Sequence, residues 1–583
     1  MFFSISRPSD GSDHEVRAAF HNFVVASTGN AVEPEVNYFN FAGYTVCDFF
    51  GLDRRPCQAV RIGDDRLLIV KGPHPRTPEE VDRFFAQHLH FSNGQVRLSE
   101  AFGGSCVFAL LNANTGSATI WCSEPPMFSI YYAAEGCVHA STRPRLTAHL
   151  VNPAKRPSLS ERYISTYLAS GYPLDDASPF DNVKTLLFGE VLHLADKAIV
   201  STAHPNPLLK YRWGDDREDV SKEATESLIR AFQSAGSPRS LEVFMSGGVD
   251  SRILLAAGLK VNPELSATTL QSPETFAAER VTGIMGKKAD VLTVEFQRGF
   301  AQESVSRAIW NAGGLINAEA HVLPLDGVFA RQDPHSVSFG NWPLYKGGYM
   351  KGFPKGIGKI ANKVRTTALP SQVASADIIA ECNSLLSRWI MLREPAVPLE
   401  LLYLFALEFR SWRWLMPNVL SVSAHHDAVY PFMDELFVRS SSAANPEDRA
   451  THRLAFRIMR RLDERLVNVG LHGVRWKFES EGPASDFLAG YEARAPLANP
   501  PQKGKSRALS TRRPGLHDKI LMREMIADHL LTSHNRHLLS ADAAAAVGSG
   551  TVEDFSSLIV GNYAEVWRMF ALAVFISRSW DRQ

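Results

Sequence analysis

The sequence has few cysteines, no imbalance of charge and no long apolar run. Only 6 of its 583 residues are cysteine and none forms a C-x-x-C pair, which argues against a zinc site and against a disulfide framework. Lysine plus arginine and aspartate plus glutamate each number 62, so no overall field attracts nucleic acid or an anionic membrane. No stretch is apolar for long enough to span a bilayer, and the first residues lack the apolar core of a signal peptide. We therefore expect a cytoplasmic protein with buried, reduced thiols.

The length and the composition describe a globular protein of more than one domain. Hydrophobic residues make up 45% and charged residues 21% of the chain, which is usual for soluble domains. A chain of 583 residues exceeds the size at which one core stops growing, so two or more domains are expected. Short apolar and β-branched runs between turn signals predict β-sheets with a few helices up to about residue 205. These runs are 65–70, 104–111, 117–122, 129–132 and 190–200.

Beyond a polar junction at 212–219, the pattern changes to helices that alternate with short strands. The periodicity predicts a helix over 221–235, strands over 265–270 and 336–340, and mostly helical chain from 400 to 470. Such alternation predicts a parallel sheet with the site at its carboxyl edge.

The most informative stretch is 241–258, where a short apolar run breaks at Ser246-Gly247-Gly248 and an apolar-periodic segment follows. The pattern predicts a strand, a tight glycine turn and a helix. Two adjacent glycines remove the Cβ atoms that would keep a phosphate away from the backbone. The N–H groups of the turn and of the helix start then form a cradle for an anion. Ser246 and Ser251 add hydroxyl donors, and Asp250 is predicted to ligate a phosphate-bound Mg²⁺.

Two common phosphate motifs do not fit this stretch. No lysine follows the glycines, so it is not a Walker loop, and the G-x-G-x-x-G spacing of a dinucleotide fold is absent. Ser-Gly-Gly-Val-Asp-Ser resembles instead the pyrophosphate loop of the ATP-pyrophosphatase superfamily, whose members cleave ATP between the α and β phosphates. The alternative is a glycine turn without a ligand. We include Leu270 and Gly340, at the ends of the next two predicted strands, in the expected ATP site.

Several ordered blocks accompany this loop, and together they resemble the asparagine synthetase family along most of the chain. The blocks are 168–172 with 182–193, 246–251, 271–281, Tyr430-Pro-Phe-Met-Asp434 and Arg475-Trp-Lys477. The resemblance implies an α/β protein that begins with a glutaminase-like (Ntn-type) α+β β-sandwich domain over 1–212. It further implies an adenine-nucleotide α-hydrolase-like domain over 213–583, with a parallel sheet, helical additions and an essential active-site lysine at Lys477.

Three departures from the family's pattern alter what is expected. The family's glutaminase needs a cysteine directly after the initiator methionine, and this chain has Phe2 there, so we expect no ammonia production from glutamine. The family's second nucleotide signature is represented by 338–349, in which the acidic pair has become Pro343-Leu344. A second carboxylate for Mg²⁺ is therefore missing from its usual place. The tail beyond Lys477 is long and divergent.

An enzyme of this architecture without a glutaminase needs another amine, most economically one on its own substrate. Two known groups work in this way: the β-lactam synthetases and the macrolactam synthetases (cyclases) of lasso peptide biosynthesis. The chain length, the altered signature and the cluster 408–414 resemble the second group more closely. That resemblance implies adenylation of an Asp or Glu side chain of a precursor peptide by ATP with Mg²⁺, followed by attack of the peptide's N-terminal amine. It also implies a leader peptidase and a leader-recognition protein as partners, and neither nucleic acid nor membrane.

Each predicted catalytic role has an alternative. Lys477 is predicted to stabilise the oxyanion and the leaving phosphate, and its alternative is a solvated surface lysine. Glu408 is predicted to orient Arg410 or Lys477 or to accept the amine's proton, and its alternative is a structural pair with Arg410 on a helix. The basic stretch 496–515 is either a solvated loop or a lid over the phosphates. For the whole chain the alternatives are an asparagine synthetase-like or β-lactam synthetase-like ligase for another acyl substrate, or a catalytically dead nucleotide-binding paralogue.

Overall fold

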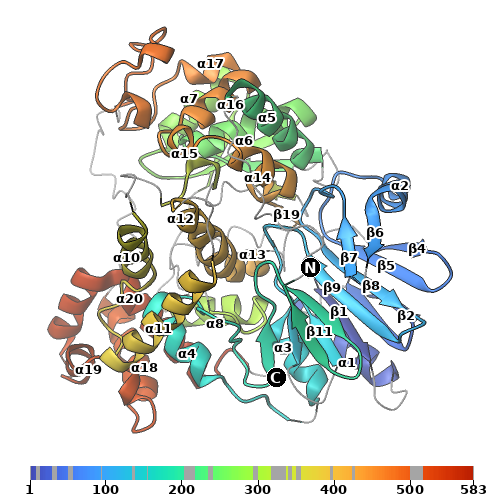
Figure 1. Ribbon diagram of the computed structural model, residues 1–583. Coiled ribbons are helices and arrows are strands. Elements are labelled where there is room, and N and C mark those ends of the chain that lie inside the picture. Colours follow the sequence, from blue (N-terminus) through green and yellow to red (C-terminus); the bar gives the residue numbers. More distant parts are fainter. Residues whose placement is uncertain are drawn as a thin grey trace.

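The fold combines β-sheets in an N-terminal part, residues 2–202, with a parallel sheet and most of the helices in a C-terminal part, residues 217–581 (Figure 1). This mixed α/β organisation agrees with the prediction. The computed structural model describes residues 2–7, 13–28, 36–49, 57–92, 95–133, 138–153, 155–202, 217–233, 241–292, 300–316, 336–338, 344–349, 356–393, 398–422, 427–498, 516–549 and 551–581. The predicted boundary after residue 212 lies outside the described residues.

Two antiparallel sheets of six strands each form the N-terminal part. In spatial order the first contains β12 (Val183–Thr185), β10 (Tyr131–Ala133), β11 (Val138–Ser141), β1 (Phe2–Arg7), β3 (Tyr44–Phe49) and β2 (Val36–Phe41). The second contains β14 (Ala198–Ser201), β13 (Val191–Leu194), β9 (Ser117–Cys122), β8 (Val107–Asn112), β5 (Arg66–Lys71) and β4 (Gln58–Ile62). The predicted strand 117–122 and the predicted hairpin over 190–200 are confirmed.

The two sheets pack face to face because alternate residues of their strands point to opposite sides. On β5, Ile69 enters the core between the sheets, whereas Leu68 enters an outer core under a helix. On β3, Val46 faces the same inner core and Cys47 faces outward. The result is a helix–sheet–sheet–helix arrangement, whose outer layers are α1 (Asp13–Thr28) and α3 (Pro144–Val151) on one side and α2 (Pro78–His88) on the other.

The sheet of the C-terminal part is fully parallel, as predicted. Its spatial order is β17 (Ala289–Leu292), β16 (Ser266–Leu270), β15 (Leu241–Phe244), β18 (Ser336–Ser338) and β19 (Asp427–Val429). The strand order reverses between β15 and β18, and ligands of open α/β sheets bind outside the carboxyl ends of strands at such a point. The helices that pack around this sheet include α5 (Arg217–Gln233), α6 (Val249–Val261), α7 (Thr275–Ile284) and α16 (Arg453–Leu462).

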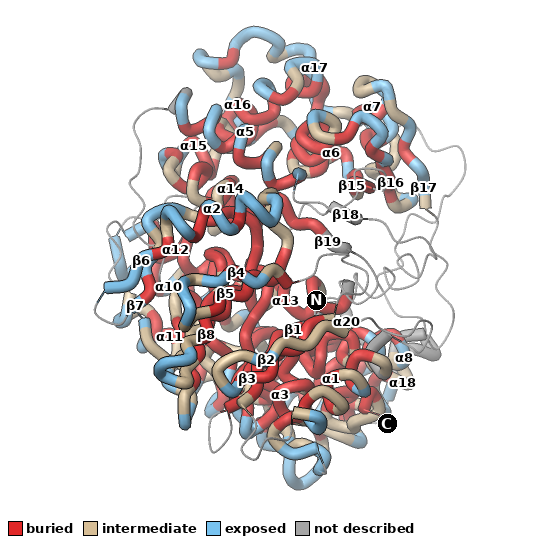
Figure 2. The backbone as a smooth tube through the Cα atoms, turned by 90° about the vertical axis from the view of Figure 1, so that its right-hand side faces the viewer, coloured by how far each residue is buried: buried red, intermediate tan, exposed pale blue. Residues whose placement is uncertain are grey.

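Helices occupy most of the remaining chain, and the predicted helical stretch 400–470 is confirmed. One hydrophobic core continues from between the N-terminal sheets into these helices, and Figure 2 shows buried segments next to exposed ones among them. The helices of this group are α4 (Glu161–Ser170), α8 (Phe300–Asn311), α10 (Ile357–Ala368), α11 (Ala376–Leu392), α12 (Glu400–Phe405), the π-helix η3 (Ala406–Trp414), α13 (Met416–Val422), α18 (Leu516–Leu530), α19 (Ala541–Gly548) and α20 (Val552–Ser577). Within the described ranges, no helix is both long enough and apolar enough to cross a bilayer.

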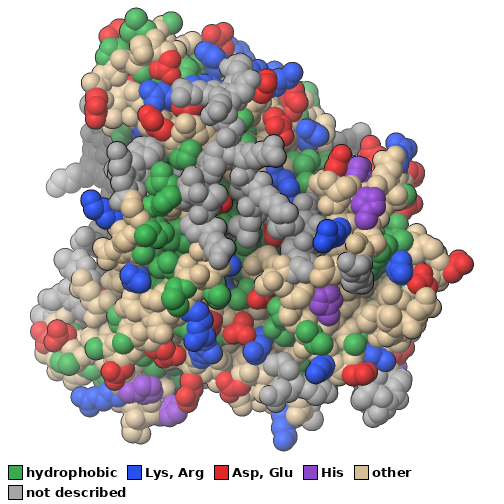
Figure 3. Space-filling view, viewed as in Figure 1, with side chains coloured by type: hydrophobic (Ala, Val, Ile, Leu, Met, Phe, Trp, Pro, Cys, Tyr) green, Lys and Arg blue, Asp and Glu red, His purple; other side chains and the backbone are tan. Residues whose placement is uncertain are grey.

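The block that starts at Tyr430 joins the N-terminal part to the C-terminal part. The N–H groups of Gly103 and Gly104 donate to Glu435 Oε2 at 3.1 Å and to Asp434 Oδ2 at 2.7 Å. Asp434 also caps α14 (Glu435–Ser442) by accepting from two of its first N–H groups. Burial raises the pKa of Asp434 to about 6 and that of Glu435 to about 7. The visible face of the molecule carries basic and acidic side chains side by side (Figure 3), in keeping with a net charge of +0.

Candidate phosphate-binding site

The predicted glycine turn lies where the parallel sheet reverses its strand order. It connects the end of β15 to α6, and Gly248 is the N-cap of that helix without a side chain to cap it. Among the described residues, no acceptor receives the N–H groups of Gly247, Gly248, Val249 and Asp250. Unpaired N–H groups and the positive end of the helix dipole make such a turn a binding site for an anion. The predicted strand, turn and helix are therefore confirmed.

Gly247 is required both by its conformation and by its neighbour. Its φ is +63°, and a Cβ at this position would lie 2.6 Å from the Cβ of Ala277 on α7. Residues with a side chain rarely adopt that backbone conformation. The close contact with α7 therefore excludes larger residues at this position.

A buried arginine that follows the loop holds it in place. Arg252 is 0% exposed, and its guanidinium donates to the Gly247 carbonyl twice, at 3.2 and 3.0 Å. It also donates to the carbonyls of Val469 and Gly470, each at 2.7 Å. Burial, and then the nearby Arg280, lower the pKa of Arg252 to about 10, so it stays charged at neutral pH. No motif in the sequence predicts this role of Arg252 in stabilising the loop.

The two serines of the motif differ in accessibility. Ser251 is buried, and its hydroxyl accepts from the Ser246 N–H at 3.2 Å and donates to the Gly248 carbonyl at 3.3 Å. It therefore stabilises the turn itself. Ser246 is exposed, so its hydroxyl is the one that a ligand in the cradle reaches most directly.

Asp250, predicted to hold Mg²⁺, already has a donor on each carboxylate oxygen. The Tyr345 hydroxyl donates to Oδ1 at 2.5 Å, and the Lys346 ammonium lies 2.6 Å from Oδ2. Both partners belong to η2 (Leu344–Lys346), within the altered second signature. In the described part of the chain, no group of three or more His, Cys, Asp or Glu side chains is placed to hold a metal. This arrangement does not fit a metal ion at Asp250.

Lys477 and Lys346 both influence the electrostatics of one residue, His452. Lys477 opens η5 (Lys477–Glu479) directly after Trp476, which is 0% exposed and anchors the segment. His452 has a φ of +70°, and burial followed by the charges of Lys477 and Lys346 lowers its pKa to about 3. The charges of Lys346 and Lys477 thus both act on His452, which is neutral at neutral pH. Lys477 itself is exposed, and its role in stabilising the oxyanion stays a prediction.

Glu408 has structural partners on a neighbouring helix. Its carboxylate accepts from Trp389 Nε1 at 2.7 Å and pairs with Arg393 at 2.6 Å, and its side chain is 6% exposed. Both partners are at the end of α11 or just beyond it. Arg410 instead stacks on the ring of Trp414. These contacts favour a structural role for Glu408, but with Trp389 and Arg393 and not in the predicted pair with Arg410. A role of Glu408 in proton transfer stays a prediction.

The two strand-end residues of the expected site have different outcomes. Leu270 ends β16, beside β15, and its carbonyl accepts from the Thr275 hydroxyl at 3.1 Å. It therefore lies at the predicted edge of the sheet. Gly340 lies outside the described residues, as does most of the basic stretch 496–515.

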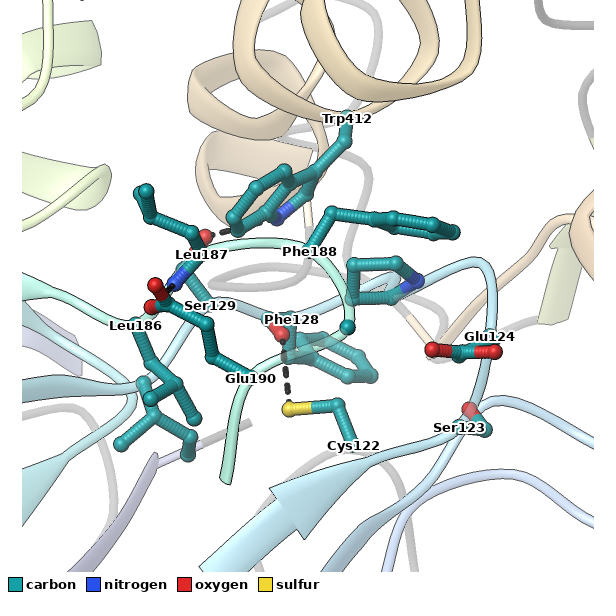
Figure 4. Close-up of a pocket in the computed structure, with 13 residues that line it drawn as sticks. Cys122, Ser123, Glu124, Phe128, Ser129, Leu186, Leu187, Phe188, Glu190 and Trp412 are labelled. Carbon is teal, nitrogen blue, oxygen red and sulfur yellow. Dashed lines mark hydrogen bonds between the residues drawn. The ribbon is translucent and has the colours of Figure 1, made fainter. Parts of the chain in front are cut away.

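A cavity lies apart from this loop, between the N-terminal sheets and η3. It measures about 10 Å³, which is near the room that one water molecule needs. Figure 4 shows Trp412 above Ser129, to which its indole N–H donates at 2.8 Å, and Cys122 against the Phe128 carbonyl. None of its lining residues belongs to the loop after β15. It is a packing defect at an interface and is too small for a nucleotide.

The cysteines described in the N-terminal part are unsuited to nucleophilic catalysis. Burial raises the pKa of Cys47 and of Cys122 to about 12, and Cys57 and Cys106 are buried. A thiol reacts as a thiolate, so Cys47 and Cys122 stay protonated at neutral pH. The expectation that no ammonia is made from glutamine stays a prediction.

Comparison with models of protein families and with curated proteins finds no match to this chain.

Proposed function

We propose that this protein is an AMP-forming, ATP-dependent carbon–nitrogen ligase that closes a macrolactam in a lasso precursor peptide. The observation that carries the proposal is the cradle of four unpaired N–H groups after β15, at the point where the parallel sheet reverses its order. Lys346 pairs with Asp250 at this cradle, and the charges of Lys346 and Lys477 both lower the pKa of His452. Such a site suits the phosphates of a nucleotide. The parts are accordingly proposed to be an Ntn-type sandwich and an adenine-nucleotide α-hydrolase-like domain.

In the first step, an oxygen of an Asp or Glu side-chain carboxylate of the peptide attacks the α-phosphorus of ATP. The bond from that phosphorus to the bridging oxygen of the β-phosphate breaks, and pyrophosphate leaves. The N–H groups from Gly247 to Asp250, with the Ser246 hydroxyl, hold the departing pyrophosphate. Donors that are fixed before the reaction stabilise the developing charge without having to reorganise.

In the second step, the peptide's N-terminal amine attacks the carbonyl carbon of the acyl-adenylate. The carbon–oxygen bond to AMP breaks, and the amine nitrogen gives up a proton as the amide forms. Lys477 stabilises the oxyanion and the phosphate of AMP as charge develops there. Holding the amine against the carbonyl supplies much of the acceleration, on the order of 7–11 kcal/mol for well-oriented intramolecular reactions.

The use of the substrate's own amine is supported by the buried thiols of the N-terminal part. The high pKa of Cys47 and of Cys122 leaves neither thiol suited to releasing ammonia from glutamine. In the proposed role, the protein works in the cytoplasm with a precursor peptide, a leader peptidase and a leader-recognition protein. The runner-up ligase, asparagine synthetase-like or β-lactam synthetase-like, acts on another acyl substrate.

A second candidate, a nucleotide-binding paralogue without turnover, is favoured by the ion pair between Lys346 and Asp250. Incubating the full chain with ATP and a precursor peptide that carries an acidic ring residue distinguishes the ligase from the nucleotide-binding paralogue. A ligase forms AMP, pyrophosphate and a product that is lighter by one water. It makes none of these from a peptide whose acidic ring residue is replaced by its amide. Nucleotide binding without AMP formation supports the paralogue.

A further inference from the structure

Lys346 is held at the phosphate loop by a rigid support. The turn that follows it contains Gly347 at φ +73° and Gly348 at φ +51°. Side chains at these glycines would approach the Ala450 nitrogen to 3.0 Å and the Ala406 Cβ to 2.9 Å. The turn is therefore clamped between two helical segments, α15 (Pro446–Ala450) and η3.

Tyr345, directly before this lysine, reinforces the support. It is 1% exposed and packs against the rings of Phe432 and Phe437, at 4.9 and 5.6 Å between centroids. Burial and the adjacent Asp250 raise the pKa of its hydroxyl well above the ordinary value. The hydroxyl thus stays protonated and keeps donating to Asp250 whether or not Lys346 does.

The ammonium of Lys346 itself remains accessible. The side chains of Lys346 and Asp250 are 21% and 22% exposed, so solvent and a ligand both reach the pair. Asp250 is the second residue of α6, which places the ammonium beside the unpaired N–H groups of the helix start. The Lys346 ammonium and the N-terminus of α6 adjoin one carboxylate here, so the local balance of charge favours an added anion.

We infer that Lys346 is a direct ligand of the nucleotide phosphates and that its ion pair with Asp250 opens when they enter. This inference rests on the proposed function and adds to it that phosphate binding needs no metal held by the protein. The ammonium exchanges one anionic partner for another, so it is never left unpaired. Asp250 keeps the hydrogen bond from Tyr345 after the exchange.

The test measures binding of inorganic pyrophosphate to the full chain by calorimetry, once with a chelator and once with Mg²⁺. The wild type is expected to bind in chelator, and Lys346→Ala is expected to bind about 10- to 100-fold more weakly, the range for losing a charged hydrogen bond. Lys346→Arg keeps the cation and should retain most of the affinity. Lys184→Ala is the matched control, because it removes a salt bridge of 3.0 Å to Asp176 in the N-terminal part and should leave binding unchanged.

The outcomes separate this inference from the function on which it rests. Equal binding by wild type and Lys346→Ala in chelator overturns the role of Lys346 and leaves the nucleotide site standing. Binding by the wild type only when Mg²⁺ is present also overturns it. Failure of the folded wild type to bind pyrophosphate or ATP under either condition rejects the proposed function itself. Thermal unfolding of each variant establishes that it is folded before its affinity is compared.

Discussion

Replacing Arg252 by methionine should loosen the phosphate loop and abolish pyrophosphate binding, although this arginine does not face the ligand. Methionine fills much of the same volume but donates no hydrogen bond. The guanidinium joins the Gly247 carbonyl to those of Val469 and Gly470. The loop therefore keeps its shape only while the segment at 469–470 accepts hydrogen bonds from this arginine. Val469 is 217 residues away from Arg252 in the sequence.

The magnitude follows from the number of carbonyl groups left without a donor. Three buried carbonyls lose their partner, and each buried unsatisfied group costs at least about 1 kcal/mol. The substitution also removes a buried cation, and the desolvation penalty of that cation disappears with it. This gain offsets part of the cost of the unpaired carbonyls, so the lower value per carbonyl applies. We therefore expect local opening of the loop to become easier by about 3 kcal/mol, equivalent to about 100-fold faster hydrogen exchange.

Hydrogen exchange measured by mass spectrometry on peptides from 241–261 and 465–475 reports this opening directly. Arg143→Met is the matched control, because Arg143 is equally buried and its guanidinium donates to the Leu420 carbonyl at 3.3 Å, away from the loop. The control should speed exchange around α3 and α13 and leave pyrophosphate binding intact. Unchanged exchange in 241–261, or wild-type affinity in Arg252→Met, would refute the reasoning.

Three further changes test other parts of the argument. Gly247→Ala should abolish pyrophosphate binding measured by calorimetry, whereas Gly286→Ala, at a similar φ of +72° but with nothing within 4 Å, should cost about 1–2 kcal/mol of backbone strain and leave binding intact. Lys477→Met should slow AMP formation in a single-turnover assay by roughly 100-fold and change pyrophosphate affinity less; equal losses in both would assign it to binding. Burial raises the pKa of Glu435 from 4.5 to about 7, so the folded protein binds the extra proton and its stability falls as pH rises through this interval. Thermal unfolding from pH 5 to pH 8 should show this decline, and Glu435→Gln should reduce it; an undiminished decline would assign it to other groups.

Local sequence patterns predicted the elements whose conformation is determined by their own residues and not by contacts with distant segments. The β-branched residues of 117–122 and 265–270 gave strands within a residue of those observed. The adjacent glycines after β15 predicted the turn, because residues with a side chain rarely adopt the backbone conformation of Gly247. Strand β17, which is short and interrupted by Asp290, became evident only from its pairing with β16.

Contacts between distant segments explain what the sequence did not predict at the site. Lys346 and Asp250 are 96 residues apart, and nothing in either segment indicates that they meet. The resemblance to the asparagine synthetase family implied that an acidic pair is replaced at 343–344, but not that the nearby Lys346 pairs with Asp250. Glu408 illustrates the converse, because its chemistry suited catalysis while its neighbours Trp389 and Arg393 hold it between helices.

The hydrogen bonds from Gly103 and Gly104 to the start of α14 connect the N-terminal sandwich to the C-terminal part and help to hold α14 in place. Phe432, a few residues before α14, packs on Tyr345, and Tyr345 holds Asp250. A continuous series of contacts thus connects the N-terminal sandwich to the loop that is proposed to bind ATP. Excising the sandwich would remove one backbone donor from each of Asp434 and Glu435 and would expose part of the apolar core that the sheets share with the helices. The sandwich thus supports the structure of the site, and the C-terminal part is not expected to keep its fold without it.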